Sequence, residues 1–250
     1  ENFKNIKGIA KEKSEIINNI QKNGKVILNR DDKFFSYLNK KAKKKSIKVT
    51  SFGKSKNSDI RLLKVKYDGT IKKMFVSLNG PVIEISFNNL NVNNILASLA
   101  VLTELNLNPK KIIQDFKNLN PSEGRGQIHN IKRYKKNFKL IDESYNANPL
   151  SVKNALDNFS KIKKNKFRKY LLLGDMLELG KNTEFYHKEL SKLINTSDID
   201  KVFIVGNKSL ITYKNLLKEK RGNIFQCNSD IDTILKNIIT NNDYLMIKGS

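Results

Sequence analysis

The sequence predicts an α/β protein in which part of a mixed-sheet domain precedes a doubly wound domain. Two observations lead to this expectation. Four apolar or alternating segments between residues 47 and 87 are punctuated by tight-turn dipeptides, as in a sheet of short strands. After residue 121, short apolar segments alternate with helical patterns, which is typical of a parallel sheet covered by helices on both faces.

The first 121 residues are expected to start with a helix, because apolar side chains recur at helical spacing over residues 4–21. Gly24 should end this helix before a strand at 25–28. A short helix should follow, with one apolar side formed by Phe34, Phe35 and Leu38. Four strands are then expected, at 47–52, 60–67, 71–78 and 82–87.

Two dipeptides that favour tight hairpin turns, Asp68-Gly69 and Asn79-Gly80, separate the last three of these strands. We therefore expect this region to be an antiparallel meander. Two amphipathic helices, at 91–105 and 109–119, should complete the first part of the chain, and the second of them begins with Pro109.

A domain boundary is expected near Pro121-Ser122-Glu123-Gly124, where the character of the sequence changes. Strands are then predicted at 138–144, 169–174, 201–206, 223–227 and 243–248. Helices are predicted between them, at 151–161, 183–194, 209–219 and 229–240. Residues 170–173 and 202–205 are continuously apolar, as buried parallel strands are. We thus expect one domain over 1–121 and a second over 122–250.

The termini and the single cysteine bear on the cellular compartment. The chain of 250 residues contains no apolar run long enough to span a membrane, and its start, Glu1-Asn2-Phe3-Lys4, is neither a signal peptide nor an initiator methionine. We therefore expect a cytoplasmic fragment of a longer protein. The lone Cys227 excludes an internal disulfide framework, and we expect it to be a small half-buried strand residue.

The formal net charge of +24 suggests nucleic acid or an anionic membrane as a partner. However, only six of the 48 basic residues are arginine, the residue that nucleic-acid sites favour for its bidentate geometry. The lysines are spread along the whole chain, and the densest clusters are Lys40–Lys45 and Lys161–Lys169. A solvated basic surface is the favoured interpretation, and a basic α/β nucleic-acid-binding module is the alternative.

Three polar segments follow predicted strands of the second domain, at 141–151, at 174–180 and at Lys248-Gly249-Ser250. The carboxyl ends of parallel strands share one edge of a sheet, and ligands bind at that edge. The structural alternative for the first segment is a loop in which Asn148 or Ser151 caps the following helix. Lys248 could face an anion there, or be one more surface lysine.

The motifs Asp-Glu-Ser-Tyr-Asn-Ala-Asn-Pro at 142–149, Gly-Asp-Met-x-Glu-Leu-Gly at 174–180 with His187 downstream, and Lys-Gly-Ser at 248–250 resemble those of the Mur ligase family. The resemblance implies that 1–121 is the later part of a central ATP-binding domain and that 122–250 is most of a Rossmann-like C-terminal domain. The chain contains no Gly-x-x-Gly-Lys-Thr/Ser phosphate loop, so we expect the isolated chain to be inactive.

The first two motifs favour the family member that joins D-alanyl-D-alanine to a UDP-N-acetylmuramoyl-tripeptide, and another amide ligase of the family is the alternative. The resemblance implies that ATP phosphorylates the terminal carboxylate of the tripeptide and that the amine of the dipeptide attacks the acyl phosphate. ATP and Mg²⁺ are the implied cofactors. The enzyme is expected to be a monomer, with neither a nucleic-acid partner nor a membrane span.

The resemblance also implies roles for three residues of the first domain. Lys13 falls within the apolar stripe of the 4–21 helix, where a lysine must snorkel, pair or change its charge. The matching lysine of the family carries a carbamate that helps to bind magnesium. Asn91 and Asn94 match two asparagines that contact adenine, although Asn88-Asn89-Leu90 replaces the usual Gly-Arg-His before them. Helix capping by Asn91 is the alternative.

In the second domain, the resemblance implies that Arg125 reaches an ATP phosphate and that Glu143, or else Asp142, contacts the ribose. Tyr145, Asn146 and Asn148 would face the dipeptide or the acyl phosphate, and Lys248 would bind substrate. Both histidines have structural interpretations: His187 on a helix behind the 174–180 loop, and His129 on a surface strand. No His/Cys cluster has the spacing of zinc ligands.

Overall fold

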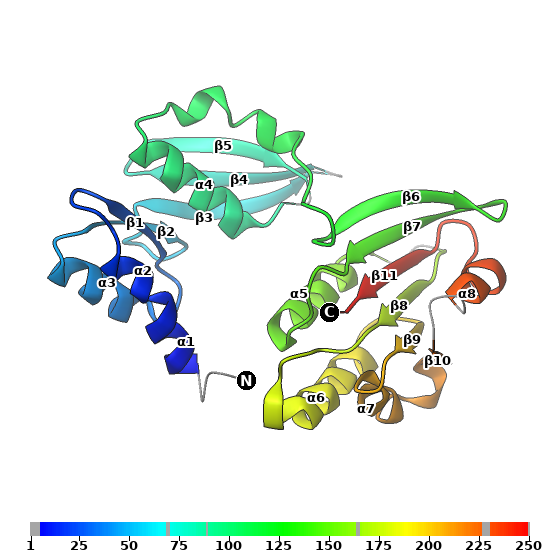
Figure 1. Ribbon diagram of the computed structural model, residues 1–250. Coiled ribbons are helices and arrows are strands. Elements are labelled where there is room, and N and C mark those ends of the chain that lie inside the picture. Colours follow the sequence, from blue (N-terminus) through cyan, green and yellow to red (C-terminus); the bar gives the residue numbers. More distant parts are fainter. Residues whose placement is uncertain (1–5, 69–70, 89, 164–165, 227–230, 250) are drawn as a thin grey trace. The chain divides into compact units, whose positions relative to one another are not determined.

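The computed structural model describes residues 6–68, 71–88, 90–163, 166–226 and 231–249. The chain divides into two compact units, Asn2–Asn120 and Pro121–Ser250, each with its own sheet (Figure 1). We call them the first and the second unit and describe each by itself. The α/β class predicted from the sequence is confirmed, whereas Cys227 lies outside the described residues.

The first unit contains a five-stranded mixed sheet in the order β1-β2-β3-β4-β5. Its strands are β1 (Lys25–Asn29), β2 (Lys48–Gly53), β3 (Ile60–Asp68), β4 (Ile71–Leu78) and β5 (Val82–Phe87). The pairs formed by β3, β4 and β5 are antiparallel, as the hairpin dipeptides predicted. The prediction of an antiparallel meander is wrong for β2, which runs parallel to both β1 and β3. No hairpin dipeptide precedes β3, and the segment 54–59 returns the chain to run in the same direction.

The helices of the first unit are α1 (Ile6–Lys13), α2 (Glu15–Asn18), α3 (Phe35–Lys44) and α4 (Val92–Glu104). One face of the sheet packs against α4, with Leu96 and Leu99 fully buried in that core. The opposite face, at β1 and β2, packs against α2 and α3 through Ile17 and Ala42. Burial of these apolar side chains on both faces stabilises the unit.

The predicted helix over 4–21 is broken at Ser14, which separates α1 from α2. The Ser14 side chain is fully buried, and its hydroxyl accepts a hydrogen bond from Lys41 Nζ at 2.7 Å and donates to the carbonyl of Lys11. Serine that bonds to the preceding turn bends or ends helices. The predicted stripe is therefore not one buried face, since Ile6 is 54% exposed and Ile16 is 68% exposed.

The predicted helix over 109–119 is also wrong in detail, because it consists of two 3₁₀ turns, η1 (Pro109–Lys111) and η2 (Asp115–Lys117). The apolar periodicity identified the side that packs, since Phe116 is buried and Ile113 lies against the same core. It did not fix the backbone conformation, because a helix of this length depends on tertiary packing.

The second unit is built on a six-stranded sheet in the order β10-β9-β8-β11-β7-β6. The strands are β6 (Gln127–Arg133), β7 (Lys136–Glu143), β8 (Lys169–Leu173), β9 (Lys201–Val205), β10 (Arg221–Phe225) and β11 (Tyr244–Lys248). Strand β6 forms an antiparallel hairpin with β7, and the other neighbouring pairs are parallel.

Helices cover both faces of this sheet, as the doubly wound prediction requires (Figure 1). Helices α5 (Pro149–Ser160), α6 (Thr183–Asn195) and α7 (Ser209–Lys214) bury their apolar side chains against one face. Helix α8 (Ile231–Asn237) lies over the other. A 3₁₀ turn, η3 (Gly180–Asn182), precedes α6, and a second, η4 (Lys218–Lys220), replaces the end of the helix predicted at 209–219. In the described ranges, no helix combines the length and the apolar character needed to cross a membrane.

Candidate functional site

The last strand of the chain lies in the middle of the sheet and brings the three polar segments to one edge. In the register of the sheet, Lys248 at the end of β11 pairs with Glu143 of β7 on one side and with Leu173 of β8 on the other. The backbone N–H of Gly174 donates to the carbonyl of Lys248 at 2.7 Å. The loops after β7 and β8 and Gly249 after β11 therefore begin side by side at the carboxyl edge of the sheet (Figure 1), whereas Ser250 lies outside the described residues.

A glycine turn at 124–126 packs on the loop that follows β7. The N–H of Gly126 donates to the carbonyl of Asp142 at 2.7 Å, and the N–H of Tyr145 donates to the carbonyl of Gly124 at 3.1 Å. Gly124 has φ +71°, and a Cβ at this residue would lie 2.7 Å from the backbone nitrogen of Tyr145. A Cβ at Gly126, with φ +90°, would lie 3.0 Å from Oε1 of Glu143. Both positions therefore favour glycine.

The structural importance of these two glycines did not follow from the sequence. Their spacing around Arg125, as Gly-Arg-Gly, was the available pattern. It gains meaning only when β6 is placed beside β7, because that pairing brings the turn onto residues 142–145.

The carboxylate of Asp142 organises this loop from within. It accepts hydrogen bonds from the backbone N–H of Gly124 at 3.1 Å, from the backbone N–H of Ser144 at 3.1 Å and from the Ser144 hydroxyl at 2.6 Å. Burial acts to raise the pKa of Asp142, but these hydrogen bonds and the charge of His129 lower it overall. The carboxylate of Asp142 is thus used for hydrogen bonds that hold the loop together.

Glu143, the next residue, is half-buried and in a different electrostatic environment. Burial raises its pKa above the ordinary value of a glutamate. The positive charges of Lys248 and Arg125 act in the opposite direction, and the neighbouring charge of Asp142 acts in the same direction as burial. Of the two adjacent carboxylates, Glu143 is therefore the one influenced by the positive charges of Lys248 and Arg125.

Two large side chains stack at the same edge. The guanidinium of Arg125 lies over the ring of Tyr145, with its central carbon 4.0 Å from the ring centroid. Both side chains are exposed, Tyr145 to 64%. The predicted phosphate-binding arginine and the predicted dipeptide-facing tyrosine are thus in contact with each other.

The predicted substrate contacts Asn146 and Asn148 differ in what their side chains do. Asn148 caps α5, since its side chain accepts from the N–H of Ser151 at 2.9 Å while the Ser151 hydroxyl accepts from the N–H of Asn148 at 3.0 Å. The helix cap by Asn148 and Ser151, which was the structural alternative for this loop, is therefore present. Asn146 is exposed, and its carbonyl is bound by the buried ammonium of Lys248.

The 174–180 loop is held from behind by α6 and α7. The side chain of Asp175 accepts from the N–H of Ser209 at 2.7 Å, at the start of α7. His187 on α6 is fully buried, with Nδ1 3.0 Å from the hydroxyl oxygen of Thr212. That hydroxyl donates to the carbonyl of His187 at 3.0 Å, so Nδ1 is the atom that donates to Thr212. Burial lowers the pKa of His187, which agrees with its structural interpretation.

The three predicted residues of the first unit lie on its helices. Asn91 is the N-cap of α4, where its side chain accepts from the N–H of Asn93 at 2.8 Å, as the capping alternative proposed. Asn94 is exposed in the first turn of the same helix. Lys13, the last residue of α1, is exposed. The prediction that Lys13 lies within a buried apolar stripe is wrong, because the helix ends at this residue.

Across the described residues, no three His, Cys, Asp or Glu side chains come together in a way that could hold a metal ion. Two charged groups that meet at this edge are the exposed guanidinium of Arg125 and the half-buried carboxylate of Glu143. A guanidinium suits phosphate oxygens, and a carboxylate suits sugar hydroxyls.

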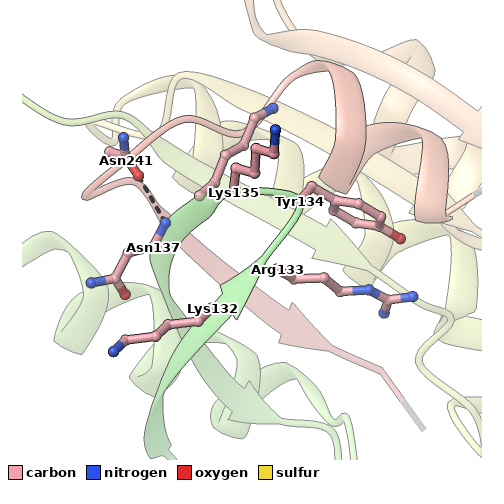
Figure 2. Close-up of a pocket in the computed structure, with 7 residues that line it drawn as sticks. Lys132, Arg133, Tyr134, Lys135, Asn137 and Asn241 are labelled. Atoms are coloured by element: carbon pink, nitrogen blue, oxygen red, sulfur yellow. Dashed lines mark hydrogen bonds between the residues drawn. The ribbon is translucent and has the colours of Figure 1, made fainter.

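A shallow depression of about 390 Å³ lies at the other end of β7, around the β6–β7 turn and Asn241 (Figure 2). Figure 2 shows the side chains of Lys132 and Arg133 extending in opposite directions, so these two positive charges do not converge. Arg133 forms an ion pair with Asp232 at 3.2 Å, and Nζ of Lys136 donates to the carbonyl of Lys236 at 2.6 Å. Two of the basic side chains around this depression are therefore already bound by groups of the protein.

Comparisons with known proteins identify the family of both units. Residues 1–102 match the family model described as Mur ligase middle domain, and residues 124–250 match the one described as Mur ligase, glutamate ligase domain. A UDP-N-acetylmuramoyl-tripeptide–D-alanyl-D-alanine ligase from Buchnera aphidicola subsp. Baizongia pistaciae is 29% identical over 98% of this chain and 52% of its own length. The ligase of the same name from Rickettsia prowazekii is 28% identical over 99% of this chain and 55% of its own length.

Solved structures show the same fold. The MurF ligase from Thermotoga maritima in complex with ADP superposes with a TM-score of 0.81 at 21% identity, over all of this chain and 55% of that protein. A folylpolyglutamate synthase from the same organism gives a TM-score of 0.65 at 17% identity, over all of this chain and 56% of that protein. The chain thus spans about half the length of the relatives that it matches.

Proposed function

This chain belongs to the Mur ligase family, and from that premise we propose that it forms part of an ATP-dependent ligase that joins D-alanyl-D-alanine to a UDP-N-acetylmuramoyl-tripeptide. The main observation behind this proposal is that Arg125, Glu143 and Tyr145 lie together at the carboxyl edge of the sheet of the second unit. Relatives with this activity in their names match nearly the whole chain, which supports this choice of substrates.

The proposed reaction has two steps. The terminal carboxylate of the tripeptide attacks the γ-phosphorus of ATP, and the bond to the bridging oxygen breaks, which gives an acyl phosphate and ADP. The amine of D-alanyl-D-alanine then attacks the acyl carbon, loses a proton, and displaces inorganic phosphate. The product is a new amide bond in a peptidoglycan precursor.

Glu143 is proposed to accept hydrogen bonds from the ribose hydroxyls, because Asp142 already uses its carboxylate within the loop. Arg125 is proposed to bind a phosphate group, which its planar guanidinium can do through two parallel hydrogen bonds. The exposed Tyr145 and Asn146 are proposed to face the dipeptide or the acyl phosphate. Asn148 is proposed to do so as well, through its side-chain N–H groups, because the capping bond uses only its side-chain oxygen.

In the first unit, Asn91 and Asn94 are proposed to contact adenine. The capping bond uses the side-chain oxygen of Asn91 and leaves its amide N–H groups as donors. Lys13 is proposed, on family resemblance, to carry the carbamate that helps to bind Mg²⁺. When bound, Mg²⁺ would neutralise negative charge on the phosphates. We place the activity in the cytoplasm, where ATP is available, and propose a monomer.

The test uses the full-length protein from which this chain comes. Phosphate release should require ATP, a UDP-N-acetylmuramoyl-tripeptide and D-alanyl-D-alanine together, and mass spectrometry should detect the pentapeptide product. Single amino acids in place of the dipeptide would distinguish other ligases of the family. The 250-residue chain alone, which has no phosphate loop, should release no phosphate.

The Glu143→Ala variant should raise the KM for ATP by about tenfold, since loss of a good hydrogen bond to a charged group weakens binding by about that factor. The KM for the dipeptide should change less. Glu184→Ala is the matched control, because Glu184 is an exposed carboxylate on α6 that forms an ion pair with Lys188 of the same helix at 2.7 Å. Equal KM values for ATP in the two variants would contradict the ribose role of Glu143.

A further inference from the structure

The most unusual cation of the second unit is Lys248, at the end of β11. Its side chain is almost completely buried, with 1% of the residue exposed. Its ammonium group donates to the backbone carbonyl of Glu143 at 3.0 Å and to that of Asn146. The two carbonyls lie at the start and near the end of the turn that follows β7, so one buried ammonium joins the end of β11 to both sides of this turn.

A buried ammonium is costly unless hydrogen bonds and an opposite charge compensate for the lost water. Lys169 in the same sheet shows the direct solution: its ammonium forms an ion pair with Asp198 at 2.6 Å and donates to the carbonyl of Phe159 at 2.9 Å. Lys248 instead donates to neutral carbonyls. Lys248 and Glu143 are paired on the neighbouring strands β11 and β7, so the positive charge of Lys248 is available to act on the Glu143 carboxylate.

We propose that Lys248 is a positioning residue: it fixes the turn at 143–146 through two carbonyls and supplies the buried positive charge that faces Glu143. This role replaces the direct substrate contact expected from the sequence, because the ammonium is already held inside the fold. An effect of Lys248 on nucleotide binding rests on the proposed function. The electrostatic coupling between the side chains of Lys248 and Glu143 does not depend on it.

The charged groups around Glu143 come from three elements. Lys248 lies on β11, Asp142 precedes Glu143 on β7, and Arg125 lies on the glycine turn. Burial and Asp142 raise the pKa of Glu143, whereas Lys248 and Arg125 lower it. Arg125 is exposed, so water screens its charge more than that of buried Lys248. In return, Glu143 raises the pKa of Lys248, which burial lowers.

The decisive measurement is the titration of the Glu143 carboxyl carbon by ¹³C NMR in the 250-residue chain, with the signal assigned from Glu143→Gln. Lys248→Met keeps the length of the side chain and removes the charge. We expect it to raise the titration midpoint of Glu143 by roughly one pH unit, the size of effect that a neighbouring opposite charge produces. An unchanged midpoint would overturn the proposal.

Lys169→Met is the matched control, because it removes an equally buried lysine at the start of β8, at the other end of the strands. It should leave the Glu143 midpoint in place. The same shift in both variants would indicate a general loosening of the unit and would overturn the specific role of Lys248.

A reciprocal measurement decides the matter even where Lys248→Met does not fold. Glu143→Gln is nearly isosteric, and it should lower the titration midpoint of the Lys248 ammonium, followed by ¹⁵N NMR of labelled lysine. A midpoint unaffected by Glu143→Gln would overturn the coupling.

In the full-length protein, Lys248→Met should raise the KM for ATP more than it lowers kcat, and the pH profile of this KM should move to higher pH. An NMR shift without any change in the KM for ATP would support the positioning role and count against the proposed ribose contact of Glu143. The two proposals can therefore fail separately.

Discussion

Arg125 and Tyr145 hold each other at the candidate site, with the guanidinium carbon 4.0 Å from the centroid of the tyrosine ring. The backbone beneath them is fixed by the bond from the N–H of Tyr145 to the carbonyl of Gly124. A substrate that moves one of the two side chains must therefore change the environment of the other. This links the proposed phosphate contact of Arg125 to the proposed dipeptide contact of Tyr145.

Removing the ring should release Arg125. A cation–π contact at an exposed site contributes about 0.5–1 kcal/mol, so Tyr145→Ala should make the Arg125 side chain more mobile on the nanosecond timescale. The measurement is the heteronuclear NOE of the arginine Nε signals, which is practical because the chain has only six arginines. Tyr145→Phe keeps the ring and should leave Arg125 as ordered as in the native chain.

The control for this experiment lies in the same spectrum. Arg133 stacks on Tyr134 at 4.8 Å and pairs with Asp232, at the opposite end of β7. Its NOE should be the same in all three proteins. Identical NOE values for Arg125 with alanine, phenylalanine and tyrosine at position 145 would show that the stack does not restrain it.

The candidate site illustrates which relationships a sequence can predict. The alternation of strands and helices predicted that the 142–149, 174–180 and 248–250 segments share an edge, because parallel strands end on the same side. It did not predict that β11 lies between β7 and β8, since strand order depends on packing over long separations. From the sequence, Lys248 was therefore expected to face an anion or to lie on the surface, whereas its neighbouring strands bury it.

Side-chain competition explains the failures in the first unit. Apolar periodicity over residues 4–21 matched a single helix, but the buried hydroxyl of Ser14 accepts from Lys41, 27 positions along the chain, and the helix ends there. A periodic pattern contains no information about such a distant partner. A distant partner also matters in the second unit. The pairing of β6 with β7 places Gly124 and Gly126 against the backbone and side chains of the loop after β7, which the sequence pattern did not reveal.

His187 should make the second unit sensitive to acid. Its pKa is lowered in the folded state, so below its ordinary value of 6.5 the unfolded chain takes up a proton more readily than the folded one. Stability is therefore greatest when His187 is neutral and should fall as the pH drops below about 6.5. Urea unfolding, followed at pH 8 and pH 5.5 by the methyl signals of Leu171 in the core beside α6, should show this loss.

His187→Gln should lower stability at pH 8, because the bond to Thr212 is disturbed, but should reduce the further loss between pH 8 and pH 5.5. His129→Gln is the matched control, since His129 is the other histidine of the chain and is exposed on β6. It should retain most of the native loss of stability on acidification, because water screens the charge of an exposed side chain. If His187→Gln and the native chain lost equal stability on acidification, His187 would not be the responsible group.

Asn148 offers a way to separate folding from catalysis at the candidate site. Its side-chain oxygen caps α5 by accepting from the N–H of Ser151. Asn148→Ala removes this cap and should destabilise the second unit by about 1 kcal/mol, measured by urea unfolding. Asn148→Asp keeps the accepting oxygen, and its negative charge is favourable at a helix N-terminus, so stability should be retained.

The two variants make different predictions for activity in the full-length protein. If the amide N–H groups of Asn148 contact the dipeptide or the acyl phosphate, Asn148→Asp should raise the KM for D-alanyl-D-alanine or lower kcat by about tenfold, since it replaces donors by a charged acceptor while the cap remains. Native kinetics in Asn148→Asp, together with loss of stability in Asn148→Ala, would limit Asn148 to capping. The substrate-facing role would then rest on Tyr145 and Asn146, which are exposed beside it.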